Sequence, residues 1–362
     1  MQRTLVILAV FVLVTVALAT GVLAANWPFW ARAWRWQLAD EGWPAVLPGP
    51  TQTLRGGTMA LPLHFDVDPA LQAFAADTNT RILLLASTDG HGSAYLAPGY
   101  TVTSYVDGRG LATGLLAPLY GLLLAQQTEL LDTPASLHFK RWRADPRGEV
   151  TARQLFWQLS GFPAGVFRPL NPASSRAQLA SGPDFERATR RWKQTWPAGS
   201  HFELSPVNSQ LLAMLVARQT GVRYAQLLEQ QLWSQLAADD AMAMLDHPRG
   251  NIAAHCCLRA TATDWLRLGL LLADSGRVGA RQLLPAGFVD EMATESPVHP
   301  GYGFGYRITA DPAAGLVLVL ETTGRQLLIA PVARRAVLWV GTGAPPLQLY
   351  RLLSAEAASG PR

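Results

Sequence analysis

The chain has 362 residues, of which 49% are hydrophobic and only 15% carry a charge. This composition excludes a disordered chain, because disorder requires low hydrophobicity and high net charge. Only one stretch is apolar and long enough to cross a bilayer, so a polytopic membrane protein is excluded as well. The length predicts one large domain with insertions, or two units.

The net charge of +4 comes from an unusual set of basic residues. Only Lys140 and Lys193 are lysines, and arginine supplies the rest of the 30 basic residues. The chain has no run of five basic residues, whereas phosphate binding usually leaves a clustered basic stripe. We therefore expect no nucleic-acid partner.

An uncharged apolar stretch runs from Thr4 to Ala25. As a helix it would reach about 33 Å, enough for a hydrocarbon core of about 30 Å. Aromatic residues mixed with Arg32 and Arg35 follow directly, namely Trp27, Phe29, Trp30, Trp34 and Trp36. They are typical of the aromatic belt at a membrane surface, although they could instead dock on the folded domain.

These features predict that residues 1–25 are an uncleaved membrane anchor. We expect a bacterial-type inner membrane, with the rest of the chain on the periplasmic side. The small residues around Val22-Leu23-Ala24 leave secretion after signal cleavage as an alternative.

Turn residues divide the rest of the chain. We expect a Trp/Pro-rich linker at 26–58, a main domain at 59–350 with a helical subdomain at about 120–250, and a flexible tail at 351–362. Apolar runs bounded by turn residues predict strands at 81–86, 93–96, 303–308, 316–320, 326–330 and 336–340. Helices are expected at 111–127, 155–157, 211–218, 224–236 and 263–273. This order predicts an α+β fold, in which an antiparallel sheet is flanked by helices, a helical domain is inserted, and one hydrophobic helix precedes them.

Several segments resemble the serine β-lactamase and penicillin-binding-protein superfamily, above all its class C-like esterases and amide hydrolases. Thr151–Phe162 (TARQLFWQLSGF) resembles T-x-R-x-L-L-x-x-x-S-G, and Pro197–Leu212 resembles P-G-x-x-F-x-Y-S-N-x-N-x-x-L-L. Leu258–Pro285 resembles the T-A-x-D-L-A-R-x-G stretch and the G-x-x-x-L-P that follows it, while Tyr302–Tyr306 (YGFGY) resembles Y-G-Y-G-W. The resemblance covers about residues 60–345.

The resemblance implies a β-lactamase/transpeptidase-like fold and acyl transfer on amides or esters. In that family a serine of S-x-x-K attacks the carbonyl, the lysine lowers the cost of its deprotonation, and the tyrosine of Y-x-N moves the proton. A K-T-G or H-x-G strand forms the far wall. No cofactor and no metal are implied.

This sequence lacks those reactive groups. Neither lysine completes S-x-x-K, since Leu137 and Arg190 lie three residues before them. Counting back from Leu119-Tyr120-Gly121, which resembles L-V-G, places the serine at Gly110 and the lysine at Thr113. The other vestigial positions are Leu204 for the tyrosine, Pro206 for the asparagine, and Thr322 or Thr323 for the cation.

Three functions remain open. The first is a family member with an emptied, inactive or strongly impaired site, which predicts no confident catalytic residue. The second is an active amide or ester hydrolase with a relocated group, for which the candidates are Ser104, Tyr105, Asp107, Thr113, Ser205 and His255. The third is a membrane-anchored protein that binds a cell-wall peptide or a small acyl ligand. Helix capping is the simpler role for Ser104 and Asp107.

The only two cysteines are the adjacent Cys256 and Cys257. Neighbouring cysteines are too close for ordinary disulfide geometry, so we expect two small, buried thiols. His255 beside them could suggest metal or thiol chemistry, but the spacing matches no ligand pattern. The other histidines are scattered, so no metal site is predicted.

Overall fold

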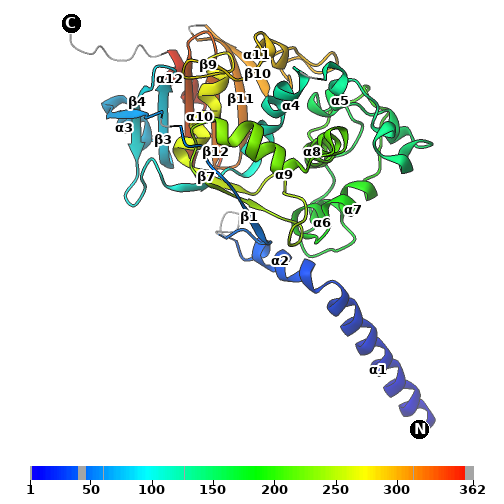
Figure 1. Ribbon diagram of the computed structural model, residues 1–362. Helices are drawn as coiled ribbons and strands as arrows, with labels where there is room; N and C mark the ends of the chain where they lie inside the picture. The colour runs from blue at the N-terminus through cyan, green and yellow to red at the C-terminus, as the bar shows by residue number, and fades with distance from the viewer. Residues whose placement is uncertain (1, 40–45, 60, 126, 313, 355–362) are drawn as a thin grey trace, which may run out of the picture.

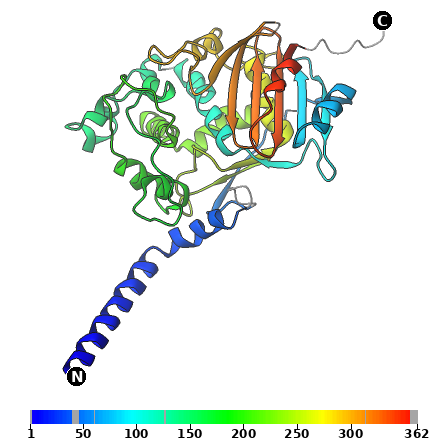
Figure 2. The same cartoon turned by 180° about the vertical axis from the view of Figure 1, so that it is seen from behind.

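The computed structural model describes residues 2–39, 46–59, 61–125, 127–312 and 314–354. A seven-stranded sheet with the order β10-β11-β12-β13-β3-β4-β2 lies at its centre (Figure 2). Its strands are β2 (His64–Val67), β3 (Thr80–Ser87), β4 (His91–Leu96), β10 (Arg307–Asp311), β11 (Gly315–Thr322), β12 (Arg325–Ala330) and β13 (Arg335–Gly341). All neighbours are antiparallel except β2 and β4, which run parallel.

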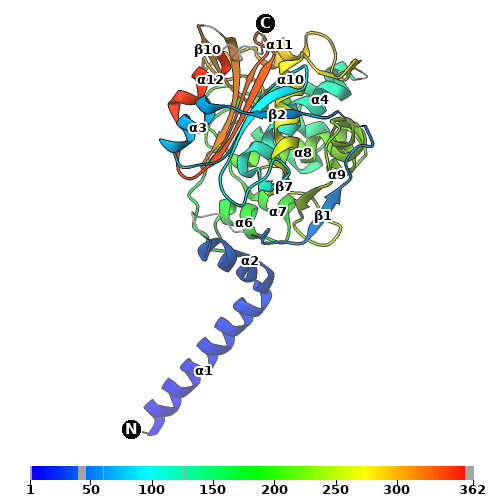
Figure 3. The same cartoon turned by 90° about the vertical axis from the view of Figure 1, so that its left-hand side faces the viewer.

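Helices cover both faces of this sheet (Figure 3). On one face lie α3 (Pro69–Ala76) and α12 (Arg351–Ser354), where Leu71 and Leu353 pack with Trp339 of β13. On the other lies α10 (Ala262–Ala273), which begins at a capping box between Thr261 and Asp264. The apolar runs that predicted β11, β12 and β13 are therefore buried between two helical layers, and the predicted α+β class is confirmed.

The helices between residues 116 and 227 gather beside the sheet (Figure 1). They are α4 (Leu116–Leu124), α5 (Ala152–Phe156), α6 (Ser175–Ser181), α7 (Phe185–Arg191), α8 (Pro206–Thr220) and α9 (Tyr224–Leu227). The coil of α9 continues as a π-helical turn at Leu228–Leu232 and a 3₁₀ turn at Trp233–Gln235, which together fill the predicted helix at 224–236. A short helix, α11 (Phe288–Met292), precedes the last four strands in the chain. Whether this region is a separate subdomain stays a prediction.

A second sheet has the order β1-β6-β7-β5. Its strands are β1 (Thr51–Leu54), β5 (Tyr105–Asp107), β6 (Ala241–Met244) and β7 (Leu258–Thr261), and a short hairpin joins β8 (Arg277–Val278) to β9 (Arg281–Gln282). Because β1 pairs with β6, part of the segment 26–58 that we expected as a linker belongs to the folded body. The expected tail begins with α12, and residues 355–362 lie outside the described residues.

Two predicted elements were wrong in their bounds. The expected helix at 111–127 is a 3₁₀ helix at Arg109–Leu115 followed by α4. Pro118 has no N–H to donate to the carbonyl of Gly114, and that carbonyl accepts the Tyr306 hydroxyl at 2.7 Å instead. The strand expected at 303–308 begins only at Arg307, because the carbonyls of Phe156 and Met292 hold Gly305 and Phe304 in a loop.

At the N-terminus, α1 (Gln2–Ala25) projects away from the domain, and α2 (Trp27–Gln37) turns against it (Figure 3). Among the described residues, no single helix passes the length and hydropathy test for a membrane span. Val10–Ala25 and Trp27–Gln37 pass it as a pair bent by 78°.

Candidate functional site

A cavity of about 300 Å³ lies where the 3₁₀ helix before α4 meets β11 and the start of α8. Five of the six vestigial motif positions line it, from all three motifs: Gly110, Thr113, Leu204, Pro206 and Thr322. The fold therefore brings together the segments that the resemblance placed in one site. What these positions can do chemically depends on the side chains that they carry.

The first motif position holds no nucleophile. Arg109 adopts a left-handed backbone with φ 52°, and the Asp107 carboxylate accepts its N–H at 2.8 Å. The next residue, Gly110, faces β11 so closely that a Cβ on it would lie 3.2 Å from the Cβ of Thr322. A side chain at residue 110 would therefore be crowded by Thr322, which would have to shift by a few tenths of an ångström.

The lysine position holds a hydroxyl that is already engaged. The Thr113 hydroxyl donates to the Gly110 carbonyl at 2.9 Å. A nucleophilic hydroxyl needs a base that accepts its proton, and a backbone carbonyl is not one. Thr113 therefore has neither the charge of a lysine nor an activated oxygen.

The second motif lies at the start of α8. Leu204, the position that the resemblance assigns to the tyrosine, lines the cavity and is 58% exposed. Pro206 is the first residue of α8, where a missing N–H costs nothing. Ser205 between them donates its hydroxyl to the Pro163 carbonyl at 2.9 Å, so it too lacks a base.

The third motif lies at the turn between β11 and β12. Thr322 lines the cavity, whereas the carbonyl of Thr323 accepts a hydrogen bond from the Arg109 guanidinium. The buried Arg325 donates to the carbonyls of Gly324 and Asp107. Two guanidinium groups therefore lie beside this turn, but they donate to backbone carbonyls and do not line the cavity.

The remaining candidates for a relocated catalytic group lie outside the cavity lining. The Ser104 hydroxyl accepts the Thr101 N–H at 2.8 Å, a local turn contact like that of Asp107. The Tyr105 hydroxyl donates to Asp240, and burial followed by neighbouring aspartates raises its pKa, which disfavours a phenolate. Burial lowers the pKa of His255 to about 3, and its ring contacts Gln210 rather than the cavity.

A buried amide network that the sequence did not reveal supports the cavity wall. Gln158, with a left-handed φ of 58°, accepts the Asn208 side-chain amide at 2.7 Å and the Ser205 N–H at 3.1 Å. Asn208 in turn accepts the Ser160 hydroxyl at 2.6 Å. The serine of the predicted S-G segment is thus a structural residue that fixes α8 against the loop after α5.

The opposite wall is aromatic and charged. The rings of Phe202 and His299 stack with centroids 3.8 Å apart, and Tyr302 packs edge-on against Phe202. Burial raises the pKa of Tyr302, so its phenol stays protonated. Arg307 lies 3.0 Å from the Glu321 carboxylate and donates to the Tyr350 hydroxyl at 2.6 Å. Of these residues, Phe202 and Tyr302 lie in segments that carry the family resemblance, whereas nothing in the sequence indicated a role for His299, Arg307 or Tyr350.

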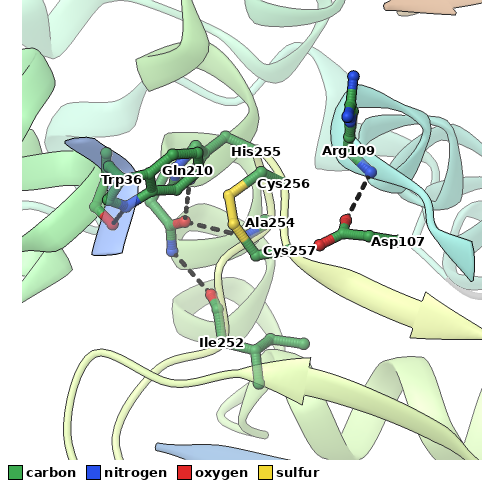
Figure 4. The surroundings of a disulfide bond; sticks show 10 residues. Trp36, Asp107, Arg109, Gln210, Ile252, Ala254, His255, Cys256 and Cys257 are labelled. Carbon is green, nitrogen blue, oxygen red and sulfur yellow. Dashed lines mark hydrogen bonds between the residues drawn. A yellow bond between two sulfur atoms is a disulfide. The ribbon is translucent and has the colours of Figure 1, made fainter. Parts of the chain in front are cut away.

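The two cysteines contradict our expectation. A disulfide joins Cys256 and Cys257, whose Cα atoms are 3.8 Å apart (Figure 4). The expected pair of free thiols was wrong: Cys257 takes a left-handed backbone with φ 69°, and both residues are buried. Gln210 accepts the Ala254 N–H beside the disulfide and contacts His255 (Figure 4). Within the described ranges, no group of three or more His, Cys, Asp or Glu residues could hold a metal.

Comparison with known families agrees with this geometry. A family model described as Beta-lactamase matches residues 115–356, which is more than half of the chain. The chain belongs to the Beta-lactamase family. The match begins at residue 115, two positions after Thr113, and so leaves out the Gly110–Thr113 segment.

Individual relatives of this family member are hydrolases by name. It is 33% identical over 169 residues to the 6-aminohexanoate-dimer hydrolase of Paenarthrobacter ureafaciens, covering 45% of this chain and 38% of that one. The chain thus matches well under half of that relative's length. A Bacillus anthracis protein provisionally named a 6-aminohexanoate-dimer hydrolase shares the fold with a TM-score of 0.70 at 20% identity, covering 84% of this chain and 88% of that one. A class C β-lactamase gives 0.58 at 13% identity, covering 81% and 95%.

Proposed function

We propose that this Beta-lactamase family member binds a small peptide or acyl ligand without forming an acyl-enzyme. The observation that carries the proposal is the glycine at residue 110 packed against Thr322, since a glycine has no side chain to hold an acyl group and a Cβ there would lie only 3.2 Å from the Thr322 Cβ. The hydroxyls of Thr113 and Ser205, which line the same cavity, donate to carbonyls rather than to a base. Covalent catalysis requires a nucleophile and a base within hydrogen-bond reach.

The shape of the cavity supports a ligand-binding role. Its volume of about 300 Å³ lies at the lower end of the range for small-molecule sites. Phe202 and His299 offer a stacked aromatic surface, and Arg307 and Glu321 offer both charges beside it. A cell-wall peptide fragment or a short acylated amine has the matching combination of apolar and polar groups.

Isothermal titration of the full chain with D-amino-acid dipeptides, muropeptides and short esters tests this proposal. We expect binding without turnover, and about tenfold weaker binding for Phe202→Ala, which removes a ring worth roughly 1–1.5 kcal/mol of aromatic contact. Phe167→Ala, a partly exposed ring outside the cavity lining, is the matched control and should bind as the natural chain does. Turnover of any of these compounds would instead support an active hydrolase with a relocated nucleophile.

We infer that α1 is an uncleaved anchor that holds the domain on the periplasmic face of an inner membrane. The uncharged stretch Thr4–Ala25 fills nearly all of α1, and α2 attaches it to the domain. The buried disulfide supports an oxidising compartment. Mass spectrometry of the membrane fraction tests this inference: the intact N-terminus is expected, whereas a soluble chain that starts near Ala25 would indicate a cleaved signal.

A further inference from the structure

The helix α2 has two distinct faces at the end of the proposed anchor. One face is buried against the domain: Phe29 and Ala33 pack on Ala177 of α6, and Arg32 donates to the Gly182 carbonyl at 2.9 Å. The other face exposes Trp27 and Trp34, at 64% and 51% of their surface. Since contacts on the buried face tie α2 to the domain, the exposed tryptophans have a defined direction relative to it.

The bend between α1 and α2 sets that direction relative to a bilayer. The two helices meet at 78°, so α2 runs nearly along the membrane surface if α1 crosses it (Figure 3). Tryptophan side chains favour the headgroup region of a bilayer. The residues at the junction, Ala25 and Asn26, therefore mark the depth at which the chain leaves the apolar core.

A cavity of about 160 Å³ opens at this junction. Its walls come from the end of α1, the start of α2, and α7, and its basic residues are Arg187 and Arg191, one turn apart on α7. Both side chains are exposed, and within the described part of the chain neither makes a hydrogen bond or an ion pair. Their neighbour Arg190, in contrast, lies 3.7 Å from Glu186.

One acidic residue also lines this cavity. The Asp184 carboxylate accepts the backbone N–H of Arg187 at 2.7 Å, and so caps α7. The two guanidinium groups therefore outnumber the single carboxylate. Paired guanidinium groups, which are planar and donate several hydrogen bonds each, suit the oxygens of a phosphate.

We propose that the cavity between α1, α2 and α7 binds the phosphate of an anionic phospholipid headgroup through Arg187 and Arg191. This inference rests on the proposed membrane anchor and not on the proposed role of the cavity beside Thr322. Bound lipid would join α7 to the membrane surface beside α2, and would fix the tilt of the domain on the bilayer.

Native mass spectrometry of the full chain, released from bilayers of equal phosphatidylglycerol and phosphatidylcholine, tests the proposal. We expect retained phosphatidylglycerol in excess over phosphatidylcholine. Arg187→Ala with Arg191→Ala should lower that retention by roughly 25-fold, because each basic side chain near an anionic surface strengthens binding about fivefold. The double lysine variant should keep most of it.

A matched control removes the same charge elsewhere. Arg277 and Arg281 lie on the β8–β9 hairpin, and Figure 1 shows β9 at the end of the domain away from α2. Their double alanine variant should retain lipid as the natural chain does. An equal loss in this control, or equal retention of the two lipids by the natural chain, would overturn the proposal.

Two further experiments distinguish a failure of the lipid site from a failure of the membrane anchor. An excess of inorganic phosphate should not displace the lipid, and displacement would overturn the proposal in favour of a free-phosphate site. Flotation with vesicles of phosphatidylcholine alone tests the anchor independently. A chain that floats but shows no anionic preference would refute the lipid site alone, whereas a chain that does not float would refute the anchor and the lipid site together.

Discussion

The side chain of Thr322 lies directly against Gly110, the position that the resemblance assigns to the nucleophilic serine. A Cβ at Gly110 would lie 3.2 Å from the Thr322 Cβ and 3.4 Å from its hydroxyl. The two residues lie more than two hundred positions apart in sequence, and they meet because β11 passes the start of the 3₁₀ helix before α4. The glycine at the first motif and the threonine at the third motif are therefore in contact in the folded chain.

Restoring the serine alone should not restore chemistry. We predict that Gly110→Ser lowers the free energy of unfolding by about 1–3 kcal/mol, because the new side chain overpacks against Thr322. Thr322→Ala removes the hydroxyl and the methyl group on that side. The loss of unfolding free energy in the double variant should therefore be smaller than the sum of the two single losses, by at least about 0.5 kcal/mol. Denaturant unfolding of the four proteins measures this coupling. An additive result, or acylation of Gly110→Ser by a β-lactam, would refute the argument.

The amide network behind the cavity should be important for stability. Asn208→Ala leaves the buried Ser160 hydroxyl without its acceptor and Gln158 with one donor fewer, which should cost about 1–3 kcal/mol. Ser200→Ala, which removes an exposed hydroxyl bonded to the Pro197 carbonyl, is the control and should stay within about 0.5 kcal/mol. Equal effects of the two substitutions in urea unfolding would show that the network is not stabilising.

The buried His255 should make the free energy of unfolding fall as the pH is lowered from about 7 to 5. Burial, followed by the nearby charge of Arg176, lowers the pKa of His255 to about 3, so the folded chain keeps this ring neutral. The unfolded chain takes up a proton near pH 6.5, so this group makes stability rise with pH between about pH 3 and pH 6.5. From pH 7 to pH 5 we predict a loss of about 2 kcal/mol.

His255→Asn is the matched variant, since its amide can replace the imidazole N–H beside Gln210. It should show a markedly flatter stability profile between pH 7 and pH 5. An unchanged profile in this variant would mean that other groups cause the pH dependence.

The vicinal disulfide makes a direct chemical prediction. Unfolded without reductant, the chain should take up no iodoacetamide, because both cysteines are paired. After reduction in denaturant it should gain two carbamidomethyl groups, counted by intact mass. Alkylation of both cysteines before reduction would show that they are free thiols.

Much of the fold could be predicted because its signals are local. The apolar runs at 316–320, 326–330 and 336–340 became β11, β12 and β13, since each is bounded by turn residues and buried on both faces. Counting back from Leu119-Tyr120-Gly121 placed Gly110 and Thr113 in the cavity. Those positions depend only on spacing within one segment.

The rest of the site depends on contacts between distant segments. Nothing local to Gln158 indicates its left-handed backbone or its bond to Asn208, and nothing near Arg307 indicates Glu321 and Tyr350. The break before α4 needed Tyr306, far along the chain, to satisfy the carbonyl that Pro118 leaves without a donor. The disulfide depended on the backbone conformation at Cys257, which the sequence does not specify.

Intact-mass spectrometry of the full chain, after incubation with a penicillin and with an activated ester, shows whether the chain can form an acyl-enzyme. We predict an unchanged mass with both reagents, whereas an active class C β-lactamase treated alongside should gain the acyl group. A stable, stoichiometric adduct on any cavity residue would contradict this prediction.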